Sequence, residues 1–331
     1  MNIFNAISQL PGQITQAFPP APAFTETELP DLFGKVYIIT GATSGIGLSL
    51  AHMLYQKNAK VYLGGRSIEK GAKAVQTVQE SCPDSIGHVS FLYVDLADLS
   101  TIKNAAQQFL QSNERLDVLF NNAGVMIPPH QEVTKQGHDL QIGTNCLGPF
   151  LLTKLLTPAM IATSRITEKG SVRVVWVSSS IAELGSPQGG IILGELDNVH
   201  KSPGLQYGIS KAGNFLYARE FARRYKEEGI ISVALNPGII NTDLKRHGSS
   251  LMQLAFDLLA YSPRYGALTE LYAGLSPELS LSMTGSWIIP WGRVGQIRKD
   301  LELAARTVVE GGNGNGSKFW EWSEGHVEIY M

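Results

Sequence analysis

The chain has 331 residues, 44% of them hydrophobic, which is enough to bury one large core. Charged residues make up only 17% and the formal net charge is -2, which excludes the strongly basic surface of most nucleic-acid-binding proteins, so we expect small, apolar partners. The two cysteines, Cys82 and Cys146, are too few for a secreted disulfide framework and lack the spacing of a zinc site, so we expect a cytoplasmic protein without a metal.

Residues 1–33 are predicted to form an amphipathic arm followed by a proline-rich linker. No stretch of the chain reaches the roughly 18 to 20 apolar residues that cross a bilayer. We expect the arm to pack against the protein's own body; docking on a second subunit of a homo-oligomer and peripheral contact with a membrane surface are two alternatives. Apolar residues recur in the arm at broadly helical spacing, and prolines then end the pattern: Ile3, Phe4, Ile7, Leu10, Ile14 and Phe18, then Pro19, Pro20, Pro22 and Pro30.

Residues 34–331 are predicted to form a single α/β domain. Short β-branched runs alternate with segments that mix apolar and polar residues at helical spacing, which is typical of a doubly wound, Rossmann-type parallel sheet. The predicted strands are Val36 to Thr40, Lys60 to Leu63, Val89 to Val94, Val118 to Asn121, Val172 to Ser178 and Ile231 to Asn236. The clearest helical segments are Gly47 to Gln56, Ser100 to Gln111, Leu147 to Met160 and Tyr207 to Tyr225.

A glycine-rich loop follows the first predicted strand and opens a helix. Its glycines can bring backbone N–H groups close to a pyrophosphate at the positive end of that helix. Without this context, a three-glycine loop could equally be an ordinary tight turn. The predicted cofactor contacts in the loop are Gly41, Thr43, Ser44, Gly45, Ile46 and Gly47.

The ends of the second and third predicted strands suggest which dinucleotide binds. Arg66 stands where an NAD-specific protein of this architecture usually has an acid, and its planar cation suits the 2′-phosphate of NADP. We therefore expect NADP(H) to be preferred over NAD(H), although Arg66 could instead stack on adenine or face water. Asp95 and the backbone N–H of Leu96 are predicted to contact the adenine; a solvated strand-end Asp95 is the alternative.

Two further turns are predicted to approach the cofactor. Asn122, Ala123 and Gly124 close the fourth strand with an amide and two small residues. After the sixth strand, Pro237 and Gly238 turn the chain sharply, and the backbone there could hold a nicotinamide carboxamide. Taken alone, each could be a plain turn. The predicted carboxamide contacts beyond this turn are Ile240 and Thr242.

Tyr207 and Lys211 stand at positions i and i+4 of a predicted helix, on one face. A phenol has an ordinary pKa near 10, so we expect the lysine cation to stabilise phenolate, lower that pKa and make Tyr207 a proton donor or acceptor.

Among the three serines after the fifth strand we select Ser179 to hydrogen-bond the substrate oxygen. Asn145 could hold a water that relays protons to Lys211, or could simply mark a helix bend.

The order of these motifs resembles that of the short-chain dehydrogenase/reductase superfamily, over about Lys35 to Thr242. The resemblance implies a catalytic tetrad of Asn145, Ser179, Tyr207 and Lys211. Tyr207 follows Ser179 at about twice the usual separation, so an insertion lies between them. In this respect the chain is more similar to the retinol-dehydrogenase-like and protochlorophyllide-reductase-like branch.

Residues 243–331 are expected to cover the substrate, as this region does in that family. The segment Trp291-Gly292-Arg293 also resembles, less specifically, reductases of fungal secondary metabolism. Bulky residues such as Tyr261, Tyr265 and Trp287 suggest a large apolar ketone or alcohol, unless they belong to the core.

The expected activity is hydride transfer between NADP(H) and a carbonyl or alcohol carbon. The alternative from another class is a non-catalytic NADP-binding regulatory or scaffold protein on the same fold. A third reading is a reductase whose physiological step also includes ring rearrangement or dehydration.

Overall fold

The computed structural model describes residues 12–128, 132–198, 202–241 and 260–331. They form one eight-stranded sheet with the order β3-β2-β1-β4-β5-β6-β7-β8, in which only the β7–β8 pair is antiparallel. The strands are β1 (Val36–Thr40), β2 (Lys60–Gly65), β3 (His88–Tyr93), β4 (Val118–Asn121), β5 (Val172–Val177), β6 (Ile230–Leu235), β7 (Trp287–Ile289) and β8 (Arg293–Gly295).

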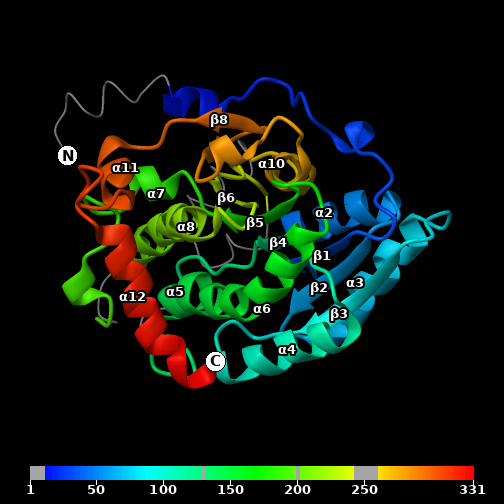
Figure 1. The fold of residues 1–331 in the computed structure, drawn as a ribbon, viewed down its shortest axis with the longest axis horizontal. Helices are drawn as coiled ribbons and strands as arrows, with labels where there is room; N and C mark the ends of the chain where they lie inside the picture. The colour runs from blue at the N-terminus through cyan, green and yellow to red at the C-terminus, as the bar shows by residue number, and fades with distance from the viewer. Residues whose placement is uncertain (1–11, 129–131, 199–201, 242–259) are drawn as a thin grey trace.

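Helices cover both faces of this sheet (Figure 1). The longer ones are α2 (Gly45–Gln56), α3 (Ile68–Ser81), α4 (Leu99–Ser112), α6 (Gly148–Arg165), α8 (Pro203–Tyr225), α10 (Pro263–Leu275) and α12 (Asn315–Val327). The shorter ones are η1 (Glu26–Glu28), α5 (Leu140–Ile142), the π-helix η2 (Gly143–Leu147), α7 (Ile181–Leu184), η3 (Leu193–Glu195), η5 (Leu281–Met283), α11 (Lys299–Ala305) and η6 (Glu328–Tyr330).

Alternating residues of β1 show how the two faces are filled. Val36 and Ile38 belong to a core shared with α4, α6 and α8, whereas Tyr37 and Ile39 belong to a second core shared with α2, α3 and α10. All five residues of β1 are buried because a parallel sheet has helices on both faces. The predicted doubly wound α/β fold is therefore confirmed, and the six predicted strands all occur within two residues of their expected bounds.

Strands β7 and β8 were not predicted, because each is only three residues long and sits among residues interpreted as substrate-covering. The prediction that no stretch is long and apolar enough to cross a membrane was also wrong, because one helix meets both criteria. Residues Leu140–Arg165 form one continuous 26-residue helical stretch of high hydropathy. Its most apolar window is 67% buried inside the fold, because α6 packs against the sheet as a core helix.

The N-terminal arm is described from residue 12 onward, so Ile3, Phe4, Ile7 and Leu10 lie outside the described residues. Gln16 is buried and joins two parts of the body, since its amide donates to Glu183 of α7 and accepts from Asn236 after β6. Arg293 of β8 donates to the backbone oxygen of Thr15. Ile14 and Phe18 of the predicted apolar stripe are instead exposed. The described part of the arm up to Phe18 thus contacts the body through polar groups, whereas Leu29 and Leu32 of the linker are buried in the second core.

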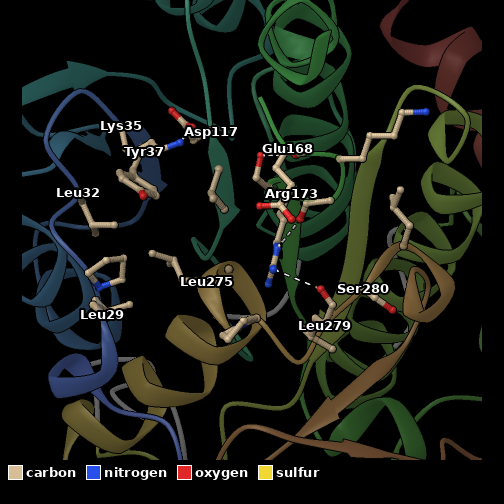
Figure 2. A pocket seen from close by; sticks show the side chains of 18 residues that line it. Leu29, Leu32, Lys35, Tyr37, Asp117, Glu168, Arg173, Leu275, Leu279 and Ser280 are labelled. Atoms are coloured by element: carbon tan, nitrogen blue, oxygen red, sulfur yellow. Dashed lines mark hydrogen bonds and ion pairs between the residues drawn. The ribbon is translucent and has the colours of Figure 1, made fainter. Parts of the chain in front are cut away.

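A buried arginine organises the edge of the sheet opposite the glycine loop (Figure 2). Arg173 of β5 lines a cavity of about 460 Å³ at the amino ends of the strands and is 5% exposed. Its guanidinium donates to the backbone oxygens of Gly170, Ala273, Ser276 and Leu279. Two of these lie at the C-terminal end of α10, where helix carbonyls lack partners and a cation is favourable. Arg173 therefore anchors α10 to the sheet.

Replacement Arg173→Ala is expected to lower the free energy of unfolding by about 3 kcal/mol or more, because several buried carbonyls lose their donor. Urea denaturation followed by circular dichroism measures this loss. The matched control is Arg165→Ala, whose side chain is 71% exposed and pairs with Glu228 at 3.7 Å. It should change stability by less than about 1 kcal/mol. Equal losses in the two variants would contradict the anchoring role.

Candidate active site

The glycines at the β1–α2 turn occupy positions that do not accept a side chain. Gly41 and Gly45 have φ angles of 68° and 60°, which disfavour residues with a Cβ. A Cβ on Gly47 would lie 2.6 Å from Nδ2 of Asn122 and 2.9 Å from the backbone oxygen of Gly41. Ser44 precedes α2 in extended conformation, and its hydroxyl makes no cap hydrogen bond. The loop therefore leaves the N-terminal N–H groups of α2 accessible to an anion, as a pyrophosphate requires.

The residues predicted to contact the adenosine half of the cofactor follow β2 and β3. Arg66 is exposed and has no hydrogen bond or ion pair among the described residues. Gly65 packs against Thr43 of the loop, where an added Cβ would lie 3.1 Å from its methyl group. Asp95 uses one carboxylate oxygen to accept from the N–H of Ala97, and the side chain of Leu96 is buried. Arg66 is thus free to meet a phosphate, whereas Asp95 is partly engaged.

Polar contacts join the ends of β1 and β4. The Thr40 hydroxyl donates to the Phe120 oxygen and accepts from the N–H of Ala123. The Asn122 amide donates to the Thr40 oxygen at 2.6 Å. Gly124 then passes close to two predicted catalytic side chains, since a Cβ there would lie 3.2 Å from Oδ1 of Asn145 and 3.3 Å from Nζ of Lys211. The predicted β4 turn therefore connects the glycine loop to the catalytic residues.

Tyr207 and Lys211 lie on one face of α8, as predicted. Nζ of Lys211 is 5.8 Å from the centre of the Tyr207 ring and donates to the Val177 oxygen at the end of β5. Both side chains are buried. Gly208 allows this packing, because a Cβ there would lie 2.4 Å from the backbone oxygen of Gly185 after α7.

The structure distinguishes the serines that follow β5. Ser178 is buried, and its hydroxyl donates to the backbone oxygen of Lys211, so it faces the core. Ser179 is half-buried, its hydroxyl accepts from the N–H of Ile181, and it lies close enough to the Tyr207 phenol to lower the pKa of that phenol. Ser180 precedes α7, and its hydroxyl caps no helix N–H. Ser179 is therefore the serine that lies beside Tyr207.

The predicted effect of Lys211 on the Tyr207 pKa is not found. Burial raises the pKa of Tyr207 to about 12, and the neighbouring Ser179 hydroxyl only partly opposes this shift. The phenolate would lose its hydration in this buried position, which is the physical reason for the higher pKa. Burial also lowers the pKa of Lys211 to about 8, against the opposite effects of Cys146 and Glu270. A neutral phenol therefore stands next to a lysine that is still mostly protonated at pH 7.

The side-chain amide of Asn145 bonds neighbouring parts of the chain. Its Oδ1 accepts from the N–H of Val125, and its Nδ2 donates to the Val125 oxygen and to the Ser210 hydroxyl. Asn145 lies in the π-helix η2, a distortion frequent at functional sites. Its side chain therefore holds the chain after β4 against α8, and the water-holding role stays a prediction.

Glu270 of α10 was missed in the sequence. It is fully buried, and neither carboxyl oxygen has a hydrogen-bond partner in the described parts of the chain. Burial raises its pKa to about 8, and the Lys211 cation opposes this shift. In the sequence it is a single acidic residue within an apolar helical stretch, and such a residue could equally face solvent. Its burial and its interaction with Lys211 depend on how α10 packs.

The turn after β6 is closed by the C-terminal region. Gly238 has a φ angle of 89°, and a Cβ there would lie 2.6 Å from the Trp291 ring. Pro237 precedes it, and the side chain of Ile240 is buried. Thr242, the predicted carboxamide ligand, lies outside the described residues.

The aromatic residues of the C-terminal region divide between core and surface. Trp287 and Trp291 are only 2% and 3% exposed, so they belong to the core. Tyr261 and Tyr265 are half-buried and pack on Trp291 with ring centres 4.9 and 5.1 Å away. Of these four residues, therefore, only Tyr261 and Tyr265 can supply the apolar surface that was predicted to contact a substrate.

The fold and the glycine loop define a nucleotide-binding protein, and comparison with known proteins specifies an oxidoreductase family. A family model described as short chain dehydrogenase matches residues 35–191. A short-chain dehydrogenase/reductase of Phomopsis amygdali is 47% identical over 335 residues, which cover 99% of this chain and 100% of that protein. The short-chain dehydrogenase/reductase bet4 of Neocamarosporium betae is 45% identical, covering 96% of this chain and 93% of the relative. The chain belongs to the short-chain dehydrogenase/reductase family.

Solved structures agree with this fold. An uncharacterized protein of Mycobacterium paratuberculosis superimposes with a TM-score of 0.67 at 28% identity, covering 92% of this chain and 97% of that one. The 3-ketoacyl-(acyl-carrier-protein) reductase of Brucella melitensis, complexed with NADH, has a TM-score of 0.59 at 21% identity and covers 77% of this chain and 96% of its own. The second similarity shows the fold alone. The glycine cradle at Gly41, Gly47 and Gly124 fits the nicotinamide cofactor that this fold binds.

Replacement Glu270→Gln is expected to reduce the pH dependence of stability. The pKa of Glu270 rises from 4.5 in its ordinary environment to about 8 in the fold, so between these values unfolding releases a proton and wild-type stability falls as pH rises. The neutral variant lacks this contribution, which is at most about 1.4 kcal/mol per pH unit. Thermal unfolding from pH 5 to 8.5 measures it, with exposed Glu321→Gln as control. Parallel curves for wild type and Glu270→Gln would contradict the buried, neutral carboxyl.

Proposed function

We propose that this protein is an NADP(H)-dependent reductase that acts on the carbonyl group of a bulky, apolar substrate. The observation that carries the proposal is the buried Tyr207 phenol, which lies beside Ser179 and one helical turn from Lys211. A phenol and a serine hydroxyl that lie side by side can both hydrogen-bond the same substrate oxygen. The nicotinamide, when bound, supplies the hydride or accepts it in the reverse oxidation.

Each residue has a distinct proposed role in the reaction. Tyr207 donates its proton to the substrate oxygen, and its pKa of about 12 keeps it protonated at neutral pH, which favours carbonyl reduction. Ser179 hydrogen-bonds the same oxygen as negative charge develops on it. Lys211 orients the ribose and supplies positive charge beside the phenol. Asn145 positions the Gly124 backbone, through Val125, against Lys211.

The preference for NADP(H) is supported by Arg66. It follows β2, is exposed and has no hydrogen-bond or ion-pair partner among the residues the structure describes. The acidic residue typical of NAD-specific proteins is missing at this strand end. A guanidinium can bind the 2′-phosphate through two parallel hydrogen bonds. Asp95, Leu96 and the turn from Pro237 to Ile240 complete the proposed cofactor contacts, and Thr242 remains a proposed carboxamide ligand.

The substrate class rests on the region around Tyr261 and Tyr265 and on fungal relatives such as pkfC of Emericella nidulans, 44% identical over 314 residues. We place the reaction in secondary-metabolite biosynthesis, in the cytoplasm, where Cys82 and Cys146 remain free thiols. The alternative of a non-catalytic NADP-binding scaffold is less well supported, because a scaffold does not require a serine hydroxyl at the Tyr207 phenol.

Tyr207→Phe and Ser179→Ala are expected to lower kcat for reduction of apolar ketones. Loss of the proton donor should reduce it by at least a hundredfold and loss of the serine hydroxyl by about tenfold to a hundredfold, with NADPH binding little changed. NADPH oxidation followed at its absorbance band measures the rate across a panel of apolar ketones. Ser180→Ala is the matched control and should retain wild-type turnover. Equal turnover by wild type and Tyr207→Phe would exclude this mechanism.

Arg66→Leu is expected to weaken NADPH binding by about tenfold to a hundredfold, because a charge-assisted hydrogen-bond pair to the phosphate is lost. NADH lacks that phosphate, so its affinity should change little. Titration of cofactor fluorescence with each dinucleotide measures both constants. Tighter binding of NADH than of NADPH by the wild type would overturn the assignment of Arg66.

A further inference from the structure

Three side chains that commonly bind metals lie together outside the Tyr207 site. They are His138 in the segment before α5, Asp197 in the segment between η3 and α8, and His326 in the last turn of α12. Their ligand atoms all lie within 4.8 Å of one another. Both imidazoles are half-buried and the carboxylate is exposed. The sequence shows no metal motif here, because the three residues are far apart in the chain.

The ring of His326 is held in the orientation a metal ligand needs. Its Nδ1 lies 2.7 Å from the backbone oxygen of Trp322, and since that oxygen only accepts, Nδ1 carries the hydrogen. Nε2, the ring nitrogen left for a metal ion, lies 3.2 Å from Oδ1 of Asp197. Metal-binding histidines commonly donate their other N–H to a backbone carbonyl in this way. The Trp322 ring packs on His326 with centres 4.2 Å apart.

His138 approaches the pair from another segment. Its ring meets that of His326 edge to face, with centres 5.2 Å apart. Its backbone is fixed by two hydrogen bonds with Thr134, and its ring nitrogens have no hydrogen-bond partner in the described ranges. Both ring nitrogens are therefore open to coordinate a metal ion.

We propose that His138, Asp197 and His326 bind one divalent transition-metal ion, with Zn²⁺ as the best match. Two imidazoles and one carboxylate are ligands suited to zinc, and water can complete a tetrahedral site. A tetrahedral zinc ion holds ligand atoms about 3.4 Å apart. The 3.2 Å separation of His326 and Asp197 fits this value. The ligand atom of His138 lies within 4.8 Å of both others, so binding requires at most a modest approach of this side chain.

Bound metal would join three segments that surround the catalytic residues. His138 immediately precedes Asp139, whose carboxylate caps α5 and so begins the helix leading to Asn145. Asp197 lies in the segment between Ser179 and α8, the helix that carries Tyr207. His326 belongs to α12, which packs against α8 (Figure 1). The ion is thus a structural clamp on the active-site walls and takes no part in hydride transfer.

Calorimetric titration of the untagged, chelator-treated protein with Zn²⁺ tests this site. Wild type is expected to bind one ion per chain, and His138→Asn, Asp197→Asn and His326→Asn should each bind at least about tenfold more weakly. Because Asp197 is exposed, its replacement should leave the fold intact. The matched control, His88→Asn at an exposed position of β3, should bind zinc as the wild type does.

A thermal shift provides a second measurement that does not depend on enzyme activity. Zinc should raise the Tm of the wild type and of His88→Asn, because binding to the folded chain stabilises it, and should not raise the Tm of the three variants. Absence of stoichiometric zinc binding to the wild type would overturn the site and leave an ordinary histidine–aspartate ion pair. Wild-type affinity in the ligand variants would also overturn it.

Discussion

The active site depends on the contact between the ends of β1 and β4, which are neighbours at the centre of the sheet. At this point the strand order changes direction, and a doubly wound sheet opens a crevice at its carboxyl edge there. The Thr40 hydroxyl and the Asn122 amide join the two strand ends. A small displacement between these strands would move both the glycine loop and Gly124, so the predicted cofactor-binding and catalytic residues are positioned by the same few hydrogen bonds.

Close packing of small residues transmits this positioning to the catalytic side chains. Gly124 lies against Asn145 and Lys211, and Gly208 brings α8 against the end of α7. Neither contact would tolerate a methyl group without movement, because protein interiors are as dense as organic crystals. As a result, Ser179 and Tyr207 meet although a long insertion separates them in sequence. That insertion is in turn tied to the C-terminal region by Arg298, which contacts Glu183 and Asp300.

Buried ionisable groups give the site an electrostatic character that differs from the expected one. The pKa of Tyr207 lies above its ordinary value and that of Lys211 below it, and both shifts come mainly from burial. Glu270 adds a third group whose pKa is displaced toward neutrality. Groups with strongly shifted pKa values are concentrated at functional sites, because packing alone rarely requires an ionisable side chain to be buried. Predicting these pKa shifts requires knowing how deeply each group is buried.

The sequence by itself determined the fold class, the six principal strands and the positions of the glycine loop, Ser179, Tyr207 and Lys211. Hydrophobic periodicity and short motifs are local properties, so they can be recognised without knowledge of packing. Only the tertiary structure decided that the Asn145 amide bonds Val125, that Trp287 and Trp291 belong to the core, that Glu270 is buried, and that His138, Asp197 and His326 meet. These features depend on contacts between residues distant in the chain, which no local pattern records.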